Sequence, residues 1–154
     1  MLPVNGKPCM EYLIEHLNSF GITEIMTNLH YRPQDVISHF GGRLIYLYEK
    51  RLLGEEGTLR AASPWFDNYT IVMNGDTLTN INISEMVRMA RGNAVKYMDG
   101  EIYAGTRIIR SYYSLGKEFL YQDPRAKWLD IGTFPGLLKA KEFVKEIYAK
   151  PTGN

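Results

Sequence analysis

The apolar positions in the first half of the chain alternate between the spacing of a helix and the spacing of a strand. Residues 8–18 carry apolar side chains at intervals of three and four, which predicts an amphipathic helix that ends at Gly21. The same criteria predict helices from Arg32-Pro33 to Gly41-Gly42, over 58–65 and over 85–91. The predicted strands are residues 22–28, 43–49 and 69–73.

This alternation predicts an α/β domain with a largely parallel sheet. The strand over residues 69–73 is almost continuously apolar, as in a strand buried on both faces. Later in the chain, short strands are predicted over residues 94–97 and 101–109, around an Asp99-Gly100 turn, before a final amphipathic helix over 137–148. Because no linker or repeat interrupts the pattern, residues 1–154 are predicted to form a single domain.

Composition narrows the functional classes. With 45% apolar and 23% charged residues among 154, the chain is typical of a soluble globular protein. A net charge of only +1 argues against a nucleic-acid surface. The single cysteine, Cys9, excludes an intramolecular disulfide, and we expect it to be a small buried residue in a reducing, cytoplasmic setting. No apolar run approaches the ~20 residues of a membrane span, and no secretory leader is recognisable at the start.

The first candidate for chemistry is Asn74-Gly75-Asp76, which follows the apolar strand. Ligands of open α/β sheets bind beyond the carboxyl ends of the strands, and Asp76 lies there if its strand is parallel and central. Gly75 allows a ligand to approach the backbone closely. A carboxylate in this place can hold Mg²⁺ together with substrate phosphates and water. The alternative is a turn in which Asp76 and Thr77 cap the following loop.

The second candidate is the segment over residues 54–57, a predicted loop bracketed by Gly54 and Gly57. Because it lies between a strand and a helix, its backbone N–H groups can face a nucleotide. Its spacing matches neither a phosphate loop nor a dinucleotide fingerprint. Glu55 and Glu56 would repel a phosphate, which favours a base or a ribose as the contacted group. Taken alone, the segment is more typical of a plain turn.

The third candidate is Trp-Leu-Asp-Ile-Gly-Thr at residues 128–133. An apolar run ends at Asp130, and Gly132 with the hydroxyl of Thr133 follows, as at the start of a helix. Taken alone, this segment is typical of a helix-capping turn. The three histidines are not spaced as a metal site, and neither a Ser-His-Asp nor a Cys-His arrangement is apparent.

Taken together and in this order, the motifs resemble those of the sugar-1-phosphate nucleotidyltransferases. The segments that carry the resemblance are Leu-Pro-Val-Asn-Gly-Lys-Pro at 2–8, Ile-Thr-Glu-Ile at 22–25, Asn-Leu-His-Tyr at 28–31, Leu53-Gly54 with Gly57, Asn74-Gly75-Asp76 and residues 128–133. The resemblance is dense over residues 1–83 and resumes over 103–144. Each motif is weak alone, but the ordered set is specific.

The resemblance implies a Rossmann-like three-layer α/β sandwich with a mixed, mostly parallel sheet, here a truncated nucleotidyltransferase fold. It implies transfer of a nucleoside monophosphate from a nucleoside triphosphate to a sugar 1-phosphate, with release of pyrophosphate. By resemblance, Asp76 and Asp130 are the catalytic residues and would hold Mg²⁺ between the phosphates of the two substrates. The same resemblance would bring Glu49, Gly54, Gly57, Asn74 and Gly75 close to the nucleotide, and Gly105 close to the sugar.

Two parts of the family pattern are missing. The Gly-x-Gly-Thr-Arg loop that wraps the triphosphate would precede Met1, and no Glu-Lys-Pro-like element follows Asp76, where Lys96 is only a positional substitute. In the family, the first strand lies between the strands that match residues 22–28 and 69–73. Without it, buried unpaired backbone groups would cost about 1–3 kcal/mol each. We therefore expect a rearranged sheet or a homo-oligomer whose second chain fills the gap.

Three hypotheses follow. The chain is an active Mg²⁺-dependent nucleotidyltransferase, a catalytically defective relative that binds a nucleotide or sugar nucleotide as a regulatory or assembly module, or a fragment of a longer enzyme. The expected partners are small substrates and a second copy of the chain, not nucleic acid or membrane. The sequence does not select the base or the sugar.

Overall fold

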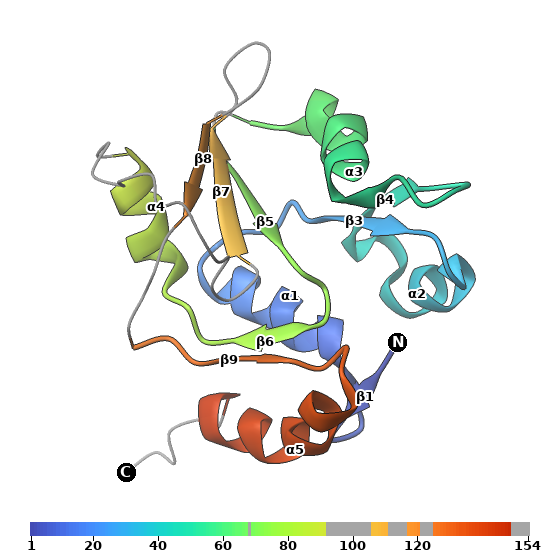
Figure 1. The fold of residues 1–154 in the computed structure, drawn as a ribbon, viewed down its shortest axis with the longest axis vertical. Helices are drawn as coiled ribbons and strands as arrows, with labels where there is room; N and C mark the ends of the chain where they lie inside the picture. The colour runs from blue at the N-terminus through green and yellow to red at the C-terminus, as the bar shows by residue number, and fades with distance from the viewer. Residues whose placement is uncertain (68, 92–105, 111–116, 121–124, 149–154) are drawn as a thin grey trace.

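The computed structural model describes residues 1–67, 69–91, 106–110, 117–120 and 125–148 (Figure 1). The helices are α1 (Cys9–Ser19), α2 (Pro33–Phe40), α3 (Gly54–Ala62), α4 (Ile83–Arg91) and α5 (Phe134–Tyr148), with 3₁₀ turns η1 (Gly41–Arg43) and η2 (Ser63–Trp65). The strands are β1 (Pro3–Val4), β2 (Lys7–Pro8), β3 (Met26–Leu29), β4 (Ile45–Tyr48), β5 (Thr70–Met73), β6 (Thr77–Thr79), β7 (Thr106–Arg110), β8 (Lys117–Leu120) and β9 (Trp128–Asp130).

The architecture is mixed α/β, as predicted, but its strands form several small sheets. The strand orders are β1-β2, β3-β4, β5-β7-β8 and β6-β9. Within the described residues only β3 and β4 pair in parallel, so the expected mostly parallel sheet is wrong for this part of the chain. One cause is loop length: a parallel connection needs about a dozen or more residues, and only residues 111–116 separate β7 from β8.

The strands expected on either side of the family's first strand do not pair with each other. Strand β3 pairs with β4, and β5 pairs with β7. Side chains bring the two sheets together: Ile25, just before β3, and Ile71 and Met73 of β5 pack against the same buried cluster, which includes Leu17. The sheet is therefore divided within the described residues, in agreement with the rearranged sheet that was predicted.

Helix α1 is the centre of the core and lies in the middle of the molecule in Figure 1. Its Cys9 and Tyr12 pack against β6, β9 and α5, its Leu17 against α4, and its Ile14 against α2 and the start of β4. One amphipathic helix thus connects three apolar clusters. Among the described helices, α1 has the most buried residues.

Two predicted elements differ from the observed ones in ways that the hydrogen bonds explain. The strand predicted over 22–28 starts only at Met26, because the N–H of Ile22 bonds the carbonyl of Leu17 and closes α1 behind Gly21, whose φ is +78°. The loop predicted over 54–57 is wrong, because α3 starts at Gly54. The strand predicted over 94–97 and the Asp99-Gly100 turn lie outside the described residues.

Among the described residues, no helix combines the length and the apolarity required to cross a bilayer.

Candidate functional site

The two candidate aspartates lie at the same end of the β6–β9 pair. In this antiparallel pair Thr77 lies opposite Asp130, so Asp76 precedes the first residue of β6 while Asp130 is the last residue of β9. The N–H of Ile131 donates to the carbonyl oxygen of Asp76 at 2.9 Å and extends the pairing by one residue. Segments more than fifty positions apart therefore present both carboxyl groups at one edge.

The carboxylates converge on Gly132. A Cβ atom built on Gly132 would lie 2.7 Å from Oδ2 of Asp76 and 3.1 Å from Oδ1 of Asp130. Two atoms that are both this close to one point are less than about 6 Å apart. A single ion with ligand distances of about 2.1 Å bridges oxygens up to about 4.2 Å apart, a separation within the range that these two distances allow. The glycine leaves open the space between the carboxylates, which any other residue would occupy.

The side chain of Asp130 is oriented by the backbone that follows it. Its Oδ1 accepts a hydrogen bond from the N–H of Gly132 at 2.7 Å. Thr133 then caps α5, because its Oγ1 accepts from the N–H of Gly136 at 3.3 Å. The helix-capping turn that residues 128–133 predicted on their own is therefore present, and it coexists with the convergence of the carboxylates. The positive end of the α5 dipole follows Asp130 directly and offsets part of the carboxylate repulsion.

The site is exposed to solvent on one side and lined by buried apolar residues on the other. Asp76 is exposed and Asp130 half-buried, whereas Leu78 and Ile131 beside them are completely buried. Cys9 is buried as predicted; its burial and the charge of Asp76 raise the pKa of its thiol to about 12. Because a nucleophilic cysteine must be a thiolate, Cys9 is unsuited to that role at neutral pH.

The residues present fit a hard divalent cation. Both groups are carboxylates, and Mg²⁺ is typically held by one or two of them, with phosphate and water oxygens filling its octahedral shell. Within the described residues no third His, Cys, Asp or Glu joins such a group. Other ligands would have to come from a substrate and from water.

Glu49, predicted to lie near the nucleotide, is only 3% exposed, and its carboxylate accepts three hydrogen bonds. Oε1 accepts from Oγ1 of Thr58 at 2.6 Å and from Nδ2 of Asn28 at 3.1 Å, and Oε2 accepts from the N–H of Leu53 at 3.2 Å. The hydrogen bond from Thr58 is the main reason why the pKa of Glu49 is lowered. Glu49 therefore connects β3, the loop after β4 and α3.

The other predicted nucleotide residues fall into two groups. Asn74 and Gly75 are exposed in the turn between β5 and β6, next to Asp76, and the carbonyl of Asn74 accepts from the N–H of Thr77. Gly54 and Gly57 lie in the first turn of α3, beside Glu49. The predicted sugar residue, Gly105, lies outside the described residues.

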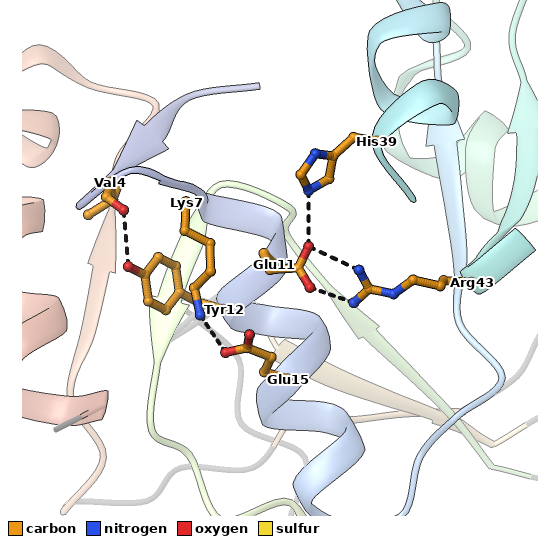
Figure 2. A network of polar contacts seen from close by, with 7 residues as sticks. All are labelled: Val4, Lys7, Glu11, Tyr12, Glu15, His39 and Arg43. Carbon is orange, nitrogen blue, oxygen red and sulfur yellow. Dashed lines mark hydrogen bonds and ion pairs between the residues drawn. The ribbon is translucent and has the colours of Figure 1, made fainter. Parts of the chain in front are cut away.

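Polar contacts join α1 to β1, β2, α2 and η1 (Figure 2). Glu11 of α1 accepts from the guanidinium of Arg43 and from Nε2 of His39, and the hydrogen bond from Arg43 is the largest cause of its lowered pKa. Lys7 donates to Glu15 at 2.5 Å and lies over the ring of Tyr12. Lys7 thus interacts with two residues of α1.

The sequence pattern did not single out Gly132, although the signal was there. A glycine two positions after a candidate ligand leaves room for a second carboxylate. This role can be recognised in a sequence only when the residue that supplies the second carboxylate is known. The Asn5-Gly6 pair was also missed as a hairpin. It has φ of +49° and +79° and joins β1 to β2, and Asn-Gly between apolar residues is a strong hairpin signal.

Comparison with known proteins finds that part of the chain is similar to several sugar-1-phosphate nucleotidyltransferases. It is 31% identical over 91 residues to a D-glycero-alpha-D-manno-heptose 1-phosphate guanylyltransferase of Campylobacter jejuni, covering 56% of this chain and 41% of that protein. A protein of the same name from Aneurinibacillus thermoaerophilus is 27% identical over 92 residues, 56% of this chain and 40% of its own length. A UTP–glucose-1-phosphate uridylyltransferase of Synechocystis is 28% identical over 109 residues, 59% and 28% of the two chains.

These similarities confirm the resemblance predicted from the motifs. The chain spans less than half the length of each of these relatives. No established family profile matches it.

Proposed function

We propose that this chain takes part in the transfer of a nucleoside monophosphate from a nucleoside triphosphate to a sugar 1-phosphate, with Mg²⁺ held by Asp76 and Asp130. The observation that carries the proposal is the convergence of the two carboxylates on Gly132. The named activities of the related guanylyl- and uridylyltransferases give the reaction class.

The chemistry asks little of the protein beyond positioning and charge. The sugar phosphate is already an anion, so its oxygen can attack the α-phosphorus without a general base. The bond to the β-phosphate oxygen breaks as the new bond forms, and pyrophosphate leaves. When bound, Mg²⁺ would supply the charge neutralisation that such transfers depend on.

The residues of this chain would contribute geometry. Asp130 is held by the N–H of Gly132, and Asp76 is held to the same edge through Ile131. Such preorientation reduces the entropy lost when two anionic substrates are brought together. The buried Leu78 and Ile131 under the site support the strand ends that carry the carboxylates.

A second candidate function is a nucleotide- or sugar-nucleotide-binding unit without complete catalytic machinery. The observation that favours it is coverage, since the chain corresponds to only 28–41% of the relatives named above. On this alternative, the chain works as part of a larger enzyme or as a regulatory relative.

One assay separates the two candidates. The protein is incubated with Mg²⁺, each nucleoside triphosphate and a panel of sugar 1-phosphates, and pyrophosphate is measured. The proposal expects release with at least one pair, and its loss in Asp76→Asn and Asp130→Asn. Asp35→Asn, on the surface of α2, is the matched control that keeps its activity.

No release from any pair would count against the transferase. If that inactive protein still binds a nucleotide by calorimetry, and Asp76→Ala abolishes binding, the second candidate is supported. If neither release nor binding is detected, both are wrong.

A further inference from the structure

Gly136 lies in the first turn of α5 and is buried against the end of β9. A Cβ atom built on it would overlap the carbonyl oxygen of Asp130 and would lie 2.9 Å from the carbonyl carbon. Real Cβ atoms essentially never approach another atom within 3.0 Å. The groups in the way belong to the backbone, so no side-chain rotation relieves the overlap.

Backbone conformation does not explain this glycine. The glycines with positive φ in the described chain are Gly6, Gly21, Gly41 and Gly54, and Gly136 is not one of them. A glycine inside a helix costs roughly 0.5–1 kcal/mol relative to alanine. Position 136 therefore requires a glycine because the Asp130 carbonyl occupies the space that a Cβ atom would need.

The peptide unit between Asp130 and Ile131, which Gly136 packs against, also positions the two carboxylates. The N–H of Ile131, in the same peptide unit as the Asp130 carbonyl, donates to the carbonyl of Asp76. The next N–H, of Gly132, holds Oδ1 of Asp130. Moving α5 away from this carbonyl, or rotating the peptide, would therefore change the distance between the two carboxylates.

We propose that Gly136 is a positioning residue for the metal-binding pair: its missing side chain lets α5 seat against the carbonyl of Asp130 and so fixes Asp130 relative to Asp76. This inference rests on the proposed function, because it assigns Gly136 a role in the same site. Gly136 itself touches neither metal nor substrate.

The test uses Mn²⁺ alone as the probe, with free Mn²⁺ measured by electron paramagnetic resonance. Gly136→Ala is expected to weaken Mn²⁺ binding about 10- to 100-fold, the usual effect of disturbing a residue behind a metal ligand. Gly42→Ala is the matched control, because a Cβ there meets no atom within 4 Å. Its affinity is expected to equal that of the wild type.

A second control separates positioning from general loosening of α5. Val144→Ala removes methyl groups from the buried cluster that docks the helix, eight residues and about 12 Å along α5 from Gly136. It is expected to lower the melting temperature while leaving Mn²⁺ affinity unchanged. Gly136→Ala should instead lose affinity at temperatures where circular dichroism shows it folded.

Each outcome supports or overturns a stated part of the inference. Equal Mn²⁺ binding by the wild type and Gly136→Ala overturns this inference alone, and equal loss in Val144→Ala overturns it in favour of a merely structural role. A wild type that binds no Mn²⁺ overturns the proposed metal pair and this inference with it. The clash involves one carbonyl and leaves the core intact, so an unfolded Gly136→Ala protein would also contradict the inference.

Discussion

Gly132 is the residue on which the geometry of the carboxylate pair depends most directly. Gly132→Ala would place a methyl group 2.7 Å from one carboxylate oxygen and 3.1 Å from the other. We expect the carboxylates to separate and Mn²⁺ affinity to fall about 10- to 100-fold. Because Gly132 is exposed and has no positive φ, the stability of the protein should change by less than about 1 kcal/mol. Paramagnetic resonance and urea unfolding measure the two effects, and unchanged affinity would contradict the convergence.

Glu49 allows a test of its structural role against its predicted part in nucleotide binding. In Glu49→Gln, one carboxylate oxygen becomes an NH₂ group that faces a donor, either Leu53 or the pair Asn28 and Thr58. A buried donor without an acceptor costs about 1–3 kcal/mol, so unfolding in urea at neutral pH should show a loss of that size. Stability equal to that of the wild type would mean that the carboxylate is not needed for the fold.

The pKa shift of Glu49 gives this residue a second signature. Its folded-state pKa lies below the ordinary value of 4.5, so the stability it contributes is present above that pH. That contribution is lost as the pH falls through the folded pKa. The wild type should therefore approach the stability of Glu49→Gln in acid.

His16 predicts a pH dependence closer to neutrality. Its Nε2 bonds the carbonyl of Ile81 at 2.9 Å, and burial lowers its pKa below 6.5. The unfolded chain therefore binds a proton before the folded one does, and stability falls as the pH drops below about 6.5. His16→Gln keeps a donor but cannot titrate, so its unfolding free energy should fall less between about pH 7.5 and 5.5. Parallel pH profiles for the two proteins would contradict this assignment.

At the residue scale, the resemblance predicted that two aspartates lie close together, whereas the surroundings of the other candidate residues were not predicted. Asp76 and Asp130 were paired by resemblance, and they do converge. The partners of Glu49 come from three segments, and no local pattern indicates that Asn28 and Thr58 meet the same carboxylate. Gly136 carried no signal, because its neighbour is a carbonyl from the preceding strand.

At the element scale, α5 is held at its far end by one tyrosine. The hydroxyl of Tyr148 donates to the carbonyl of Thr79 at 2.7 Å and accepts from its N–H at 3.2 Å. Thr79 is fully buried, so Tyr148→Phe leaves two backbone groups unpaired and should cost about 1–3 kcal/mol in urea unfolding. Tyr46→Phe is the matched control: its hydroxyl bonds the carbonyl of Gly41 at an exposed position, and its loss should cost less. Equal losses of unfolding free energy would contradict the stabilising role of the hydrogen bonds between Tyr148 and Thr79.

The helices were predicted best where a strong periodic pattern coincides with burial. Helix α1 lies within one residue of its predicted bounds, because its apolar stripe faces the core over its whole length. Helix α3 starts earlier than predicted, since the contacts of Glu49 with Leu53 and Thr58 hold a turn that two glycines would otherwise weaken. Tertiary contacts thus overrode local propensity at that end.

At the scale of the whole molecule, the sequence predicted the class of fold but not its pairing. Alternating patterns identify strands and helices, whereas strand partners depend on the lengths of connections and on what other strands are available. The ligand position proposed for Asp76 assumed that β5 is central and parallel. It pairs with β7 in antiparallel orientation and has no strand on its other side in the described part of the chain.

Strand β3 is also unpaired on one side within the described residues, and open edges of this kind recruit further strands. We therefore predict a homo-oligomer, to be measured as molar mass by light scattering. The carbonyl groups of Ile25 and Leu29 accept hydrogen bonds from the β4 side. Backbone groups alternate in direction along a strand, so the N–H of Met26 points to the open edge of β3. Met26→Pro removes the N–H at that edge without touching the β3–β4 ladder and should shift the mass to the monomer.

The circular dichroism of Met26→Pro serves as the control, because a folded monomer is the informative product. A wild type that is monomeric at all concentrations would show that the divided sheet is stable without a second chain at the edge of β3. In that case, the packing of Ile25, Ile71 and Met73 around Leu17 is enough to join the two sheets. A wild-type oligomer that Met26→Pro leaves intact would instead move the interface away from β3.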